Sequence, residues 1–278
     1  MKLCTSISDT RSFISDLRRA GKAIAFVPTM GALHEGHISL VHLAKQHADC
    51  VIVSIFVNPT QFGPNEDFAK YPRTEEKDLA MCQEAGVSAV FLPTVDEMYP
   101  KDATVYVDET RLSKGLCGAA RPTHFRGVLT VVAKLFNIVQ PDVAVFGQKD
   151  AQQVALIERM VRDLDMPIRI VRGATHREAD GLAMSSRNRY LSADERRRAL
   201  CLSQALAKSK EMMAQGKTNT EDVINAMRQI IERAQGTVDY IACVDASTLE
   251  PVTAIGTGTL VALAVKMGTT RLIDNAVL

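Results

Sequence analysis

No stretch of this sequence is apolar for long enough to cross a bilayer, which argues against a protein anchored by a spanning helix. Two of its longest apolar runs lie at residues 51–57 and 260–265. The first residues lack the apolar core of a secretory signal and carry an early acidic residue, Asp9. We therefore expect a cytoplasmic protein.

The sequence also lacks paired cysteines and an excess of charge of either sign. Its six cysteines include no C-x-x-C pair and are irregularly spaced, which is typical of reduced structural thiols rather than of a disulfide or zinc framework. The 33 basic and 32 acidic side chains give a net charge of +1. No large part of the chain is a basic block, which argues against a nucleic-acid surface. A small anionic ligand is still possible, because it needs only a local cluster of basic side chains.

Apolar runs that are typical of buried strands alternate with amphipathic helical patterns in the first part of the chain. Such alternation predicts an α/β fold, a Rossmann-like doubly wound parallel sheet with helices on both faces. The strands are expected at residues 23–27, 51–57, 87–92, 142–146 and 168–171, and the helices at 36–48, 74–85, 124–139 and 150–164.

After about residue 172 the pattern changes to two helical segments followed by three strand-like runs. Ser192 and Glu195 have the spacing of a capping box at the start of the first helix. We expect a Rossmann-like domain over 1–173 and a smaller α+β domain over 174–278. In the smaller domain the helices are expected at 192–214 and 219–234, and the strands at 238–244, 259–265 and 272–276.

The most informative segment is P-T-M-G-A-L-H-E-G-H at residues 28–37, where the first expected strand leads into a helix. His34 and His37 are three residues apart, a spacing that places side chains on one helix face. A helix N-terminus favours phosphate, and Gly36 lets a flat group such as a purine approach the backbone. The segment predicts a nucleoside triphosphate site. Taken alone, the two histidines would also fit a solvated surface or half of a metal site.

Three further polar segments follow expected strands, at residues 58–63, 147–153 and 177–188. Ligands of doubly wound sheets bind at the carboxyl ends of the strands, so we expect all four segments to surround one mouth of the sheet. The M-S-S-R sequence at 184–187 supplies two hydroxyls and a guanidinium, which are good phosphate donors. Taken singly, each segment also fits an ordinary turn, helix cap or linker.

Together with R-P-T-H-F-R-G-V at residues 121–128, these segments resemble the pantothenate synthetase family of the nucleotidylyltransferase superfamily. The resemblance covers residues 23–192 and has Arg187 where relatives place a lysine. It implies that ATP drives the condensation of pantoate with β-alanine through a pantoyl adenylate, with release of AMP and pyrophosphate. It also implies Mg²⁺ with unidentified protein ligands and a homodimer. Residues 177–188 lie between the two expected domains and include Gly181, which can absorb a backbone change, so we expect the C-terminal domain to act as a lid.

The resemblance also implies roles for individual residues. The catalytic set would be His34, His37, Lys149, Ser185, Ser186 and Arg187. The ATP contacts would be Pro28, Thr29, Met30, Gly31, His34, Gly36, His37, Gly147, Lys149, Asp150, His176, Met184, Ser185, Ser186 and Arg187. The contacts to pantoate and β-alanine would be Met30, Asn58, Gln61, Phe62 and Gln153.

Two other functions stay open from the residues alone. One is a transferase of the same superfamily that adenylylates a phosphate and retains AMP in its product. The other is a nucleotide-binding or RNA-binding module without catalysis. The glutamine pair Gln61 and Gln153 argues against the first, and the balanced charge argues against RNA.

Overall fold

The computed structural model describes residues 1–64 and 66–278, which form two compact units. Residues 112–120 and 148–155 group with the later part of the chain. Lys149, Asp150 and Gln153 therefore belong to the second unit. Unit 1 comprises Met1–Arg111, Arg121–Gly147 and Leu156–Ala174, and unit 2 comprises Leu112–Ala120, Gln148–Ala155 and Thr175–Leu278.

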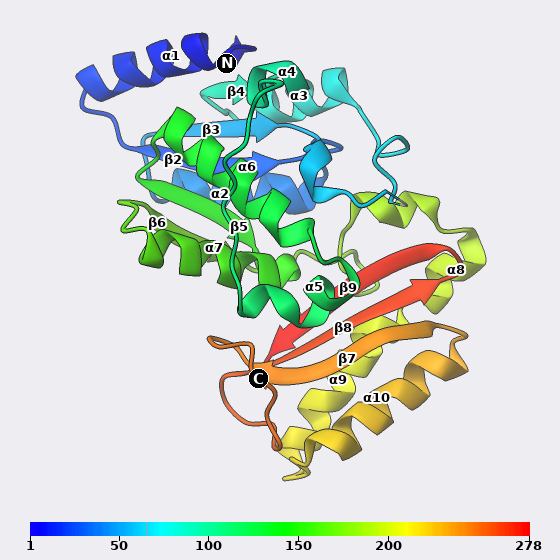
Figure 1. Cartoon of the computed structure of the whole chain (residues 1–278). Helices are drawn as coiled ribbons and strands as arrows, with labels where there is room; N and C mark the ends of the chain where they lie inside the picture. The colour runs from blue at the N-terminus through cyan, green and yellow to red at the C-terminus, as the bar shows by residue number, and fades with distance from the viewer. Residues whose placement is uncertain (65) are drawn as a thin grey trace. The chain divides into compact units, whose positions relative to one another are not determined.

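Unit 1 is built on a six-stranded parallel sheet in the order β1-β4-β3-β2-β5-β6 (Figure 1). The central strand β2 is completely buried over residues 24–27, as expected of a strand covered on both faces. The predicted Rossmann-like α/β fold is confirmed, with one further edge strand, β1, that is too short to give a sequence pattern. The strands are β1 (Lys2–Cys4), β2 (Ile24–Thr29), β3 (Cys50–Ile55), β4 (Ala89–Phe91), β5 (Val143–Gly147) and β6 (Arg169–Gly173).

The four helices predicted for the first part of the chain form close to their expected ranges, and α1 and α4 are additional. The longest, α6, is buried along most of its length, which suits its nearly continuous apolar sequence. Helix α1 was not predicted, although Ile7, Ile14 and Leu17 have the spacing of one face of an amphipathic helix. The elements are α1 (Ile7–Arg19), α2 (Glu35–Lys45), η1 (Pro59–Gln61), α3 (Glu75–Glu84), α4 (Val95–Met98) and α6 (His124–Val139), with α7 (Ala151–Asp163) starting in unit 2 and ending in unit 1.

Unit 2 is a three-stranded antiparallel sheet, β7-β8-β9, with helices α9 and α10 packed on one face. Each strand lies where the sequence predicts one. The elements are η2 (Leu112–Lys114), α5 (Leu116–Ala120), η3 (Gln148–Asp150), η4 (Ser186–Tyr190), α8 (Ala193–Arg198), α9 (Cys201–Ala214), α10 (Thr220–Arg233), β7 (Thr237–Asp245), β8 (Thr259–Met267) and β9 (Thr270–Val277).

The expectation of a single helix over residues 192–214 was wrong. The chain forms α8 and α9, separated at Ala199 and Leu200. There the N–H of Leu200 bonds to the carbonyl of Arg197 and the N–H of Leu202 to that of Ala199, each three residues back, which tightens the turn. Both residues favour helix, so local propensity gives no sign of the break. The capping box at the start of α8 is confirmed, because Ser192 and Glu195 each accept the other's backbone N–H.

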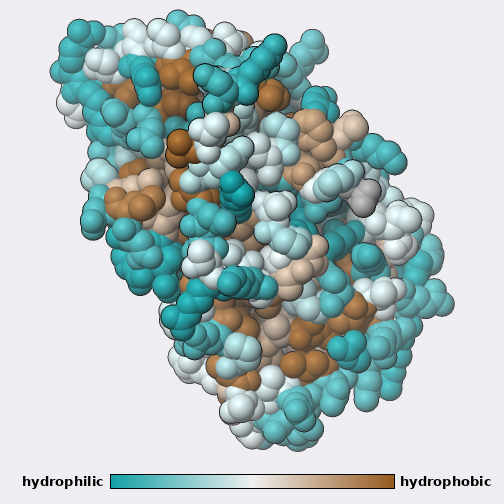
Figure 2. Space-filling model, viewed as in Figure 1, coloured by the Kyte–Doolittle hydropathy of each residue, from teal (hydrophilic) through white to brown (hydrophobic). Residues whose placement is uncertain are grey.

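The surface is mainly polar on the face shown in Figure 2, where hydrophobic residues gather in several separate groups. Among the described residues, two adjacent hydrophobic side chains are exposed, Val105 at 84% and Tyr106 at 48%. They lie on a segment without helix or strand, residues 103–109. None of the described helices has the length and apolar character needed to span a membrane.

Candidate active site

A buried carboxylate shapes the turn that joins β2 to α2. Asp78 of α3, which is 1% exposed, accepts the backbone N–H groups of Ala32 and Leu33, both at 2.8 Å. Gly31 has a φ of +79°, a conformation that glycine adopts without strain. Asp78, which is distant in the sequence, therefore fixes the conformation of the turn. The turn places His34 at the start of α2.

The two histidines cap this helix together. His34 is the N-cap residue, and its Nδ1 accepts the N–H of Gly36 at 3.2 Å, while Nδ1 of His37 accepts the N–H of His34 at 3.3 Å. Because both Nδ1 atoms are acceptors, each neutral ring carries its hydrogen on Nε2. The ring centroids are 4.1 Å apart. The sequence motif thus places two imidazole N–H donors side by side at the positive end of a helix, where phosphate is favoured.

The other predicted ATP contacts of this segment surround the same turn. Pro28 and Thr29 end β2, Met30 and Gly31 lie in the turn, and Gly36 lies in the first turn of α2. The hydroxyl of Thr29 donates to the carbonyl of Ser54 at 2.8 Å and accepts the N–H of Gly31 at 3.1 Å. Its side chain is therefore used to hold the turn.

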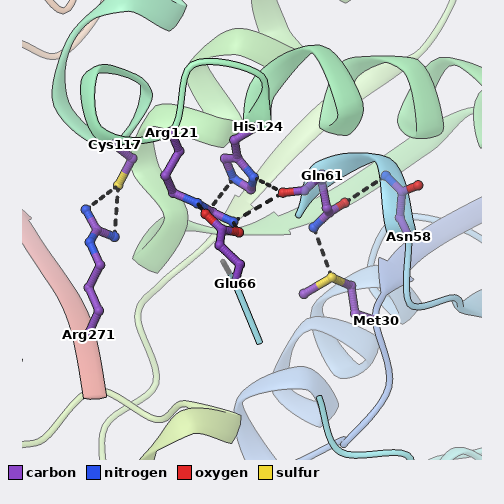
Figure 3. A network of polar contacts seen from close by, with 8 residues as sticks. All are labelled: Met30, Asn58, Gln61, Glu66, Cys117, Arg121, His124 and Arg271. Carbon is purple, nitrogen blue, oxygen red and sulfur yellow. Dashed lines mark hydrogen bonds and ion pairs between the residues drawn. The ribbon is translucent and has the colours of Figure 1, made fainter. Parts of the chain in front are cut away.

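Gln61, a predicted pantoate contact, lies at the end of β3 in η1 (Figure 3). Its Oε1 accepts from Asn58 at 3.0 Å, and its Nε2 donates to Sδ of Met30 at 2.9 Å. A thioether is a weak acceptor, so a ligand hydroxyl can replace this contact at little cost. Gln61 and Met30, predicted to bind the same substrate, are in direct contact.

Asn58, another predicted substrate contact, is buried among polar groups of unit 1. It is 1% exposed, and its amide nitrogen donates to Gln61 and to the carbonyl of Gly127 at 3.1 Å. Its Oδ1 accepts from Thr60 and, at 2.8 Å, from the hydroxyl of Tyr99. All its polar groups are used inside unit 1, so the geometry favours a role in orienting Gln61 over direct contact with a substrate.

A charged network that the sequence reading did not single out holds the backbone of Gln61 (Figure 3). The carbonyl of Gln61 accepts from Nδ1 of His124 at 2.8 Å and from Nη2 of Arg121 at 3.2 Å. Since a carbonyl only accepts, His124 carries its hydrogen on Nδ1, and its Nε2 accepts from Arg121 at 3.0 Å. Arg121 also forms a bidentate ion pair with Glu66, at 2.6 and 2.5 Å. The R-P-T-H segment thus ties η1 to the start of α6.

The ion pair keeps Glu66 ionised. Burial alone would raise the pKa of Glu66, but the hydrogen bond and charge of Arg121 outweigh it and hold this pKa below its usual value. The contact is therefore complete at neutral pH. The stability it contributes is lost as the pH falls through the lowered pKa of the folded protein.

We expect Arg121→Gln to raise the KM for pantoate about tenfold with a smaller change in kcat. A hydrogen bond to a charged group contributes about 1.5–3 kcal/mol, and its loss lets the backbone of Gln61 move. Steady-state kinetics with varied pantoate measure the effect. The matched control is Arg126→Gln in the first turn of α6, because Arg126 lies 4.1 Å from the ring centroid of Tyr106 and no described contact joins it to Gln61. Equal KM values in the two variants would contradict the positioning role.

Phe62, the remaining predicted substrate contact of this segment, belongs to an aromatic group. Its ring centroid lies 5.3 Å from that of Phe68 and 6.0 Å from that of Tyr71. Tyr71 is buried. These rings give the segment after η1 an apolar surface suited to methyl groups.

Unit 2 holds three predicted site residues of the third segment. Lys149 and Asp150 lie in η3, and Gln153 lies in the first turn of α7. Gly147 ends β5 in unit 1. The neighbouring Gln152 has a structural role, because its buried amide accepts the N–H of Cys117 and donates to the carbonyls of Leu112 and Gly115.

Cys117, which Gln152 holds, lies beside a second polar group in unit 2. Its Sγ is 3.3 Å from the hydroxyl of Tyr240 and 3.6 Å from Nη2 of Arg271. Burial, together with the neighbouring thiol, raises the pKa of Tyr240, so its hydroxyl stays protonated. These side chains join residues 112–120 to the sheet of unit 2.

The fourth segment forms a short hairpin that leads into η4. Arg177 and Ala183 form a β-bridge, the N–H of Met184 bonds to the carbonyl of His176 at 3.0 Å, and Gly181 makes the turn with a φ of +96°. Ser185 is the N-cap of η4 and accepts the N–H of Arg187 at 3.3 Å.

Asn188 and Arg196 support this hairpin. Asn188 donates to the carbonyl of Ala183 and to Glu178, and Arg196 pairs with Glu178 and Asp180. The hairpin thereby brings His176, Met184, Ser185, Ser186 and Arg187 into one short stretch of unit 2.

In unit 1 the structure brings His34 into contact with His37 and Gln61 into contact with Met30. In unit 1, β2, β3 and β5 are neighbouring parallel strands, so the segments that follow them leave the same edge of the sheet, as predicted. Asp78, Glu66, Arg121 and His124 were missed as supporting residues. Among the described residues, no group of three or more His, Cys, Asp and Glu side chains is placed to hold a metal ion.

Comparisons with known proteins give the family. The sequence profile of the Pantoate-beta-alanine ligase family matches residues 2–277. The pantothenate synthetase of Moorella thermoacetica is 54% identical over 279 residues, which covers 100% of this chain and 99% of that protein. A pantothenate synthetase structure from Thermus thermophilus has a TM-score of 0.95 at 42% identity and covers 99% of both chains.

A third relative was solved with ligands. It is the pantoate-beta-alanine ligase of Francisella tularensis, complexed with beta-gamma ATP and beta-alanine. Its TM-score is 0.83 at 34% identity, covering 100% of this chain and 97% of that one. The chain therefore belongs to the pantoate-beta-alanine ligase family of enzymes.

Proposed function

We propose that this chain carries out the reaction of its family with the residues described above, and that it condenses D-pantoate with β-alanine at the expense of ATP. The observation that carries the assignment of residues is the pair of imidazole N–H donors of His34 and His37 at the start of α2. A related ligase was solved with an ATP compound and β-alanine, which supports ATP as substrate.

In the first step a carboxylate oxygen of pantoate attacks the α-phosphorus of ATP. The bond from this phosphorus to the bridging oxygen breaks, pyrophosphate leaves with the electron pair, and pantoyl adenylate remains. Two anions have to meet, so neutralisation of charge and positioning supply most of the rate. The proposed donors to the phosphates are His34 and His37 of unit 1, and Lys149, Ser185, Ser186 and Arg187 of unit 2.

The histidines act in this step through hydrogen bonds. Their Nδ1 atoms are held by backbone N–H groups, which fixes the rings before the nucleotide arrives. Donors that are already oriented stabilise developing charge without reorganisation. We therefore assign His37 chiefly to stabilising the phosphate oxygens.

In the second step the amine of β-alanine attacks the carbonyl carbon of the adenylate. The new C–N bond forms, the bond from the carbonyl carbon to the phosphate oxygen breaks, and AMP leaves while the amine releases a proton. The acyl phosphate is already activated, so this step depends less on phosphate-binding side chains. The two steps are therefore expected to respond differently to substitution of His37.

Pantoate presents a carboxylate, two hydroxyls and two methyl groups. We propose that the amides of Gln61 and Gln153 bind its polar groups, since an amide adds no negative charge that would repel the substrate. Met30 and Phe62 would pack on the methyl groups. The contact of Gln61 with Met30 supports a shared substrate for these two residues.

Mg²⁺ is proposed to accompany ATP. The described residues supply no cluster of ligands for the ion. With a nucleotide, Mg²⁺ is usually held mainly by phosphate oxygens and water. Asp150 in η3 is the candidate for an outer contact, and in the family pattern it fits an adenosine ribose contact together with Gly147. When bound, the ion supplies neutralisation of phosphate charge.

The reaction is tested by measuring AMP and pyrophosphate release from ATP and Mg²⁺, with each acid present or omitted. We expect AMP only when both pantoate and β-alanine are present, and exchange of pyrophosphate into ATP with pantoate alone. AMP retained in a phosphate-linked product would instead indicate the adenylylation of a phosphate. ATP binding without turnover would indicate a binding module.

We also propose that the chain is a cytoplasmic homodimer. The proposal rests on the family resemblance and, for the location, on six free cysteines, five of them buried. Light scattering coupled to size-exclusion chromatography tests the dimer through the mass in solution. A mass of about one chain at micromolar concentration would contradict it.

A further inference from the structure

Two neighbouring buried polar residues near the end of β9 belong to opposite faces of the unit 2 sheet. Successive side chains of a strand point to opposite faces. Asp274 pairs in register with Leu263, whose side chain packs with α9 and α10, and Asn275 pairs with Ala262, which packs with Ala151. Asp274 is 1% and Asn275 5% exposed. A polar pair buried in this way needs partners on both faces.

Asn275 finds its partners in η3, the element that carries Lys149. Its Nδ2 donates to the carbonyl of Gln148 at 3.0 Å and to the carbonyl of Lys149 at 2.8 Å, and its Oδ1 accepts from Nε2 of Gln148 at 3.4 Å. Both hydrogens of the amide are therefore used on the backbone of η3. One side chain fixes the main chain from which the lysine projects.

Asp274 finds its partner in the hairpin that precedes η4. Its two oxygens accept from Nη1 and Nη2 of Arg177 at 2.7 and 2.9 Å, and Arg177 also donates to the carbonyl of Gly181 at 3.1 Å. A bidentate pair of this kind fixes orientation as well as distance. The hairpin that leads to Ser185 and Arg187 is thus tied to the same strand.

We infer that Asp274 and Asn275 form a positioning pair that sets the two phosphate-binding segments of unit 2 in register with each other. The inference rests on the proposed roles of Lys149 and Arg187. One strand, β9, binds η3 through Asn275 and the hairpin through Asp274. The positions of both segments are therefore set by the same strand. Neither residue needs to touch a substrate for this role.

A double-mutant cycle between Asn275→Asp and Lys149→Ala tests the first half. The substitution keeps the size of the side chain and replaces a donor with a carboxylate that faces two carbonyl oxygens. We expect Asn275→Asp to lower pantoate-dependent pyrophosphate release about 10²-fold, the order of loss that follows a misplacement of about 1 Å. In the Lys149→Ala background the same change should cost less than about threefold, because residues that act as a unit are not additive.

The control is Asn225→Asp on α10, an exposed position that receives the same chemical change and is expected to leave the rate unchanged. Equal losses from Asn275→Asp in both backgrounds, or no loss in either, would overturn the inference. Wild-type activity of Lys149→Ala would instead overturn the proposed role of the lysine. If Asn275→Asp does not fold, Asn275→Ser, which is too short to reach both carbonyls and adds no charge, takes its place in the cycle.

The second half is tested by Asp274→Asn with Arg187→Ala. Asp274→Asn removes the charge opposite Arg177 while the side chain keeps its size. We expect a loss of about tenfold or more in the first step, and a smaller one in the Arg187→Ala background. Additive losses would show that Asp274 supports only the fold, and would overturn the link to the hairpin.

Discussion

Replacement of His37 by alanine is expected to lower pantoate-dependent release of pyrophosphate by about 10²–10³-fold, the usual loss for one oriented donor to a developing negative charge. Its Nδ1 accepts the N–H of His34 at 3.3 Å, so the ring is oriented by the backbone. The lost capping bond costs about 0.5–2 kcal/mol of stability. That loss leaves the protein folded and is separated from the catalytic effect by thermal unfolding of the variant.

The decisive comparison is between the two half-reactions. If His37 stabilises phosphate charge in the first step, the variant should turn over added pantoyl adenylate much better than it forms it. Rapid-quench measurement of each step gives the ratio. His42→Ala, an exposed position of the same helix, should leave both steps unchanged. Equal losses in both half-reactions would contradict the assignment of His37 to the first step.

The fold could be predicted because its strands are buried on both faces. Such strands are continuous apolar runs, and the runs around residues 24–27 and 143–146 lie in strands of the parallel sheet. The order of strands and helices then fixes which ends carry the polar segments. Breaks between good helix formers, such as Ala199–Leu200, carry no comparable signal.

The site could be predicted in part for a related reason. His34 and His37 are local, so their spacing in the sequence is also their spacing in the structure. The residues that support them and Gln61 are distant in the chain. His124 is 63 residues from Gln61, and Asn275 is 126 residues from Lys149. A side chain that acts on a backbone so far away leaves no periodic pattern, and only the fold reveals it.

Asn58 and Gln61 belong to the same sequence motif but have different surroundings in the structure. The resemblance implies substrate contacts for Asn58, Gln61 and Phe62, and the contacts of Asn58 and Gln61 in the structure differ. Asn58 points inward to Gly127 and Tyr99, and its neighbour in the motif, Gln61, has only a weak acceptor in Met30. The difference between a binding and a positioning amide depends on α6, which lies outside the motif.

The contact between η1 and α6 leads to the second large effect, that of Gly127→Ala. A Cβ at this position would collide with the carbonyl oxygen of Thr60 and lie 2.7 Å from the backbone nitrogen of Gln61. These are backbone atoms, which cannot rotate away. We expect stability to fall by about 1–3 kcal/mol, as in other overpacked sites, although alanine favours helix by about 1 kcal/mol over glycine.

The same displacement should also weaken substrate binding. Moving η1 breaks the 3.1 Å bond from Asn58 to the carbonyl of Gly127 and shifts the amide of Gln61, so the KM for pantoate should rise about tenfold or more. Thermal unfolding and kinetics with varied pantoate measure the two effects. Gly256→Ala is the control, because its Cβ would meet open space. Destabilisation without a change in the KM for pantoate would mean that the backbone of η1 does not set the position of Gln61 in the complex.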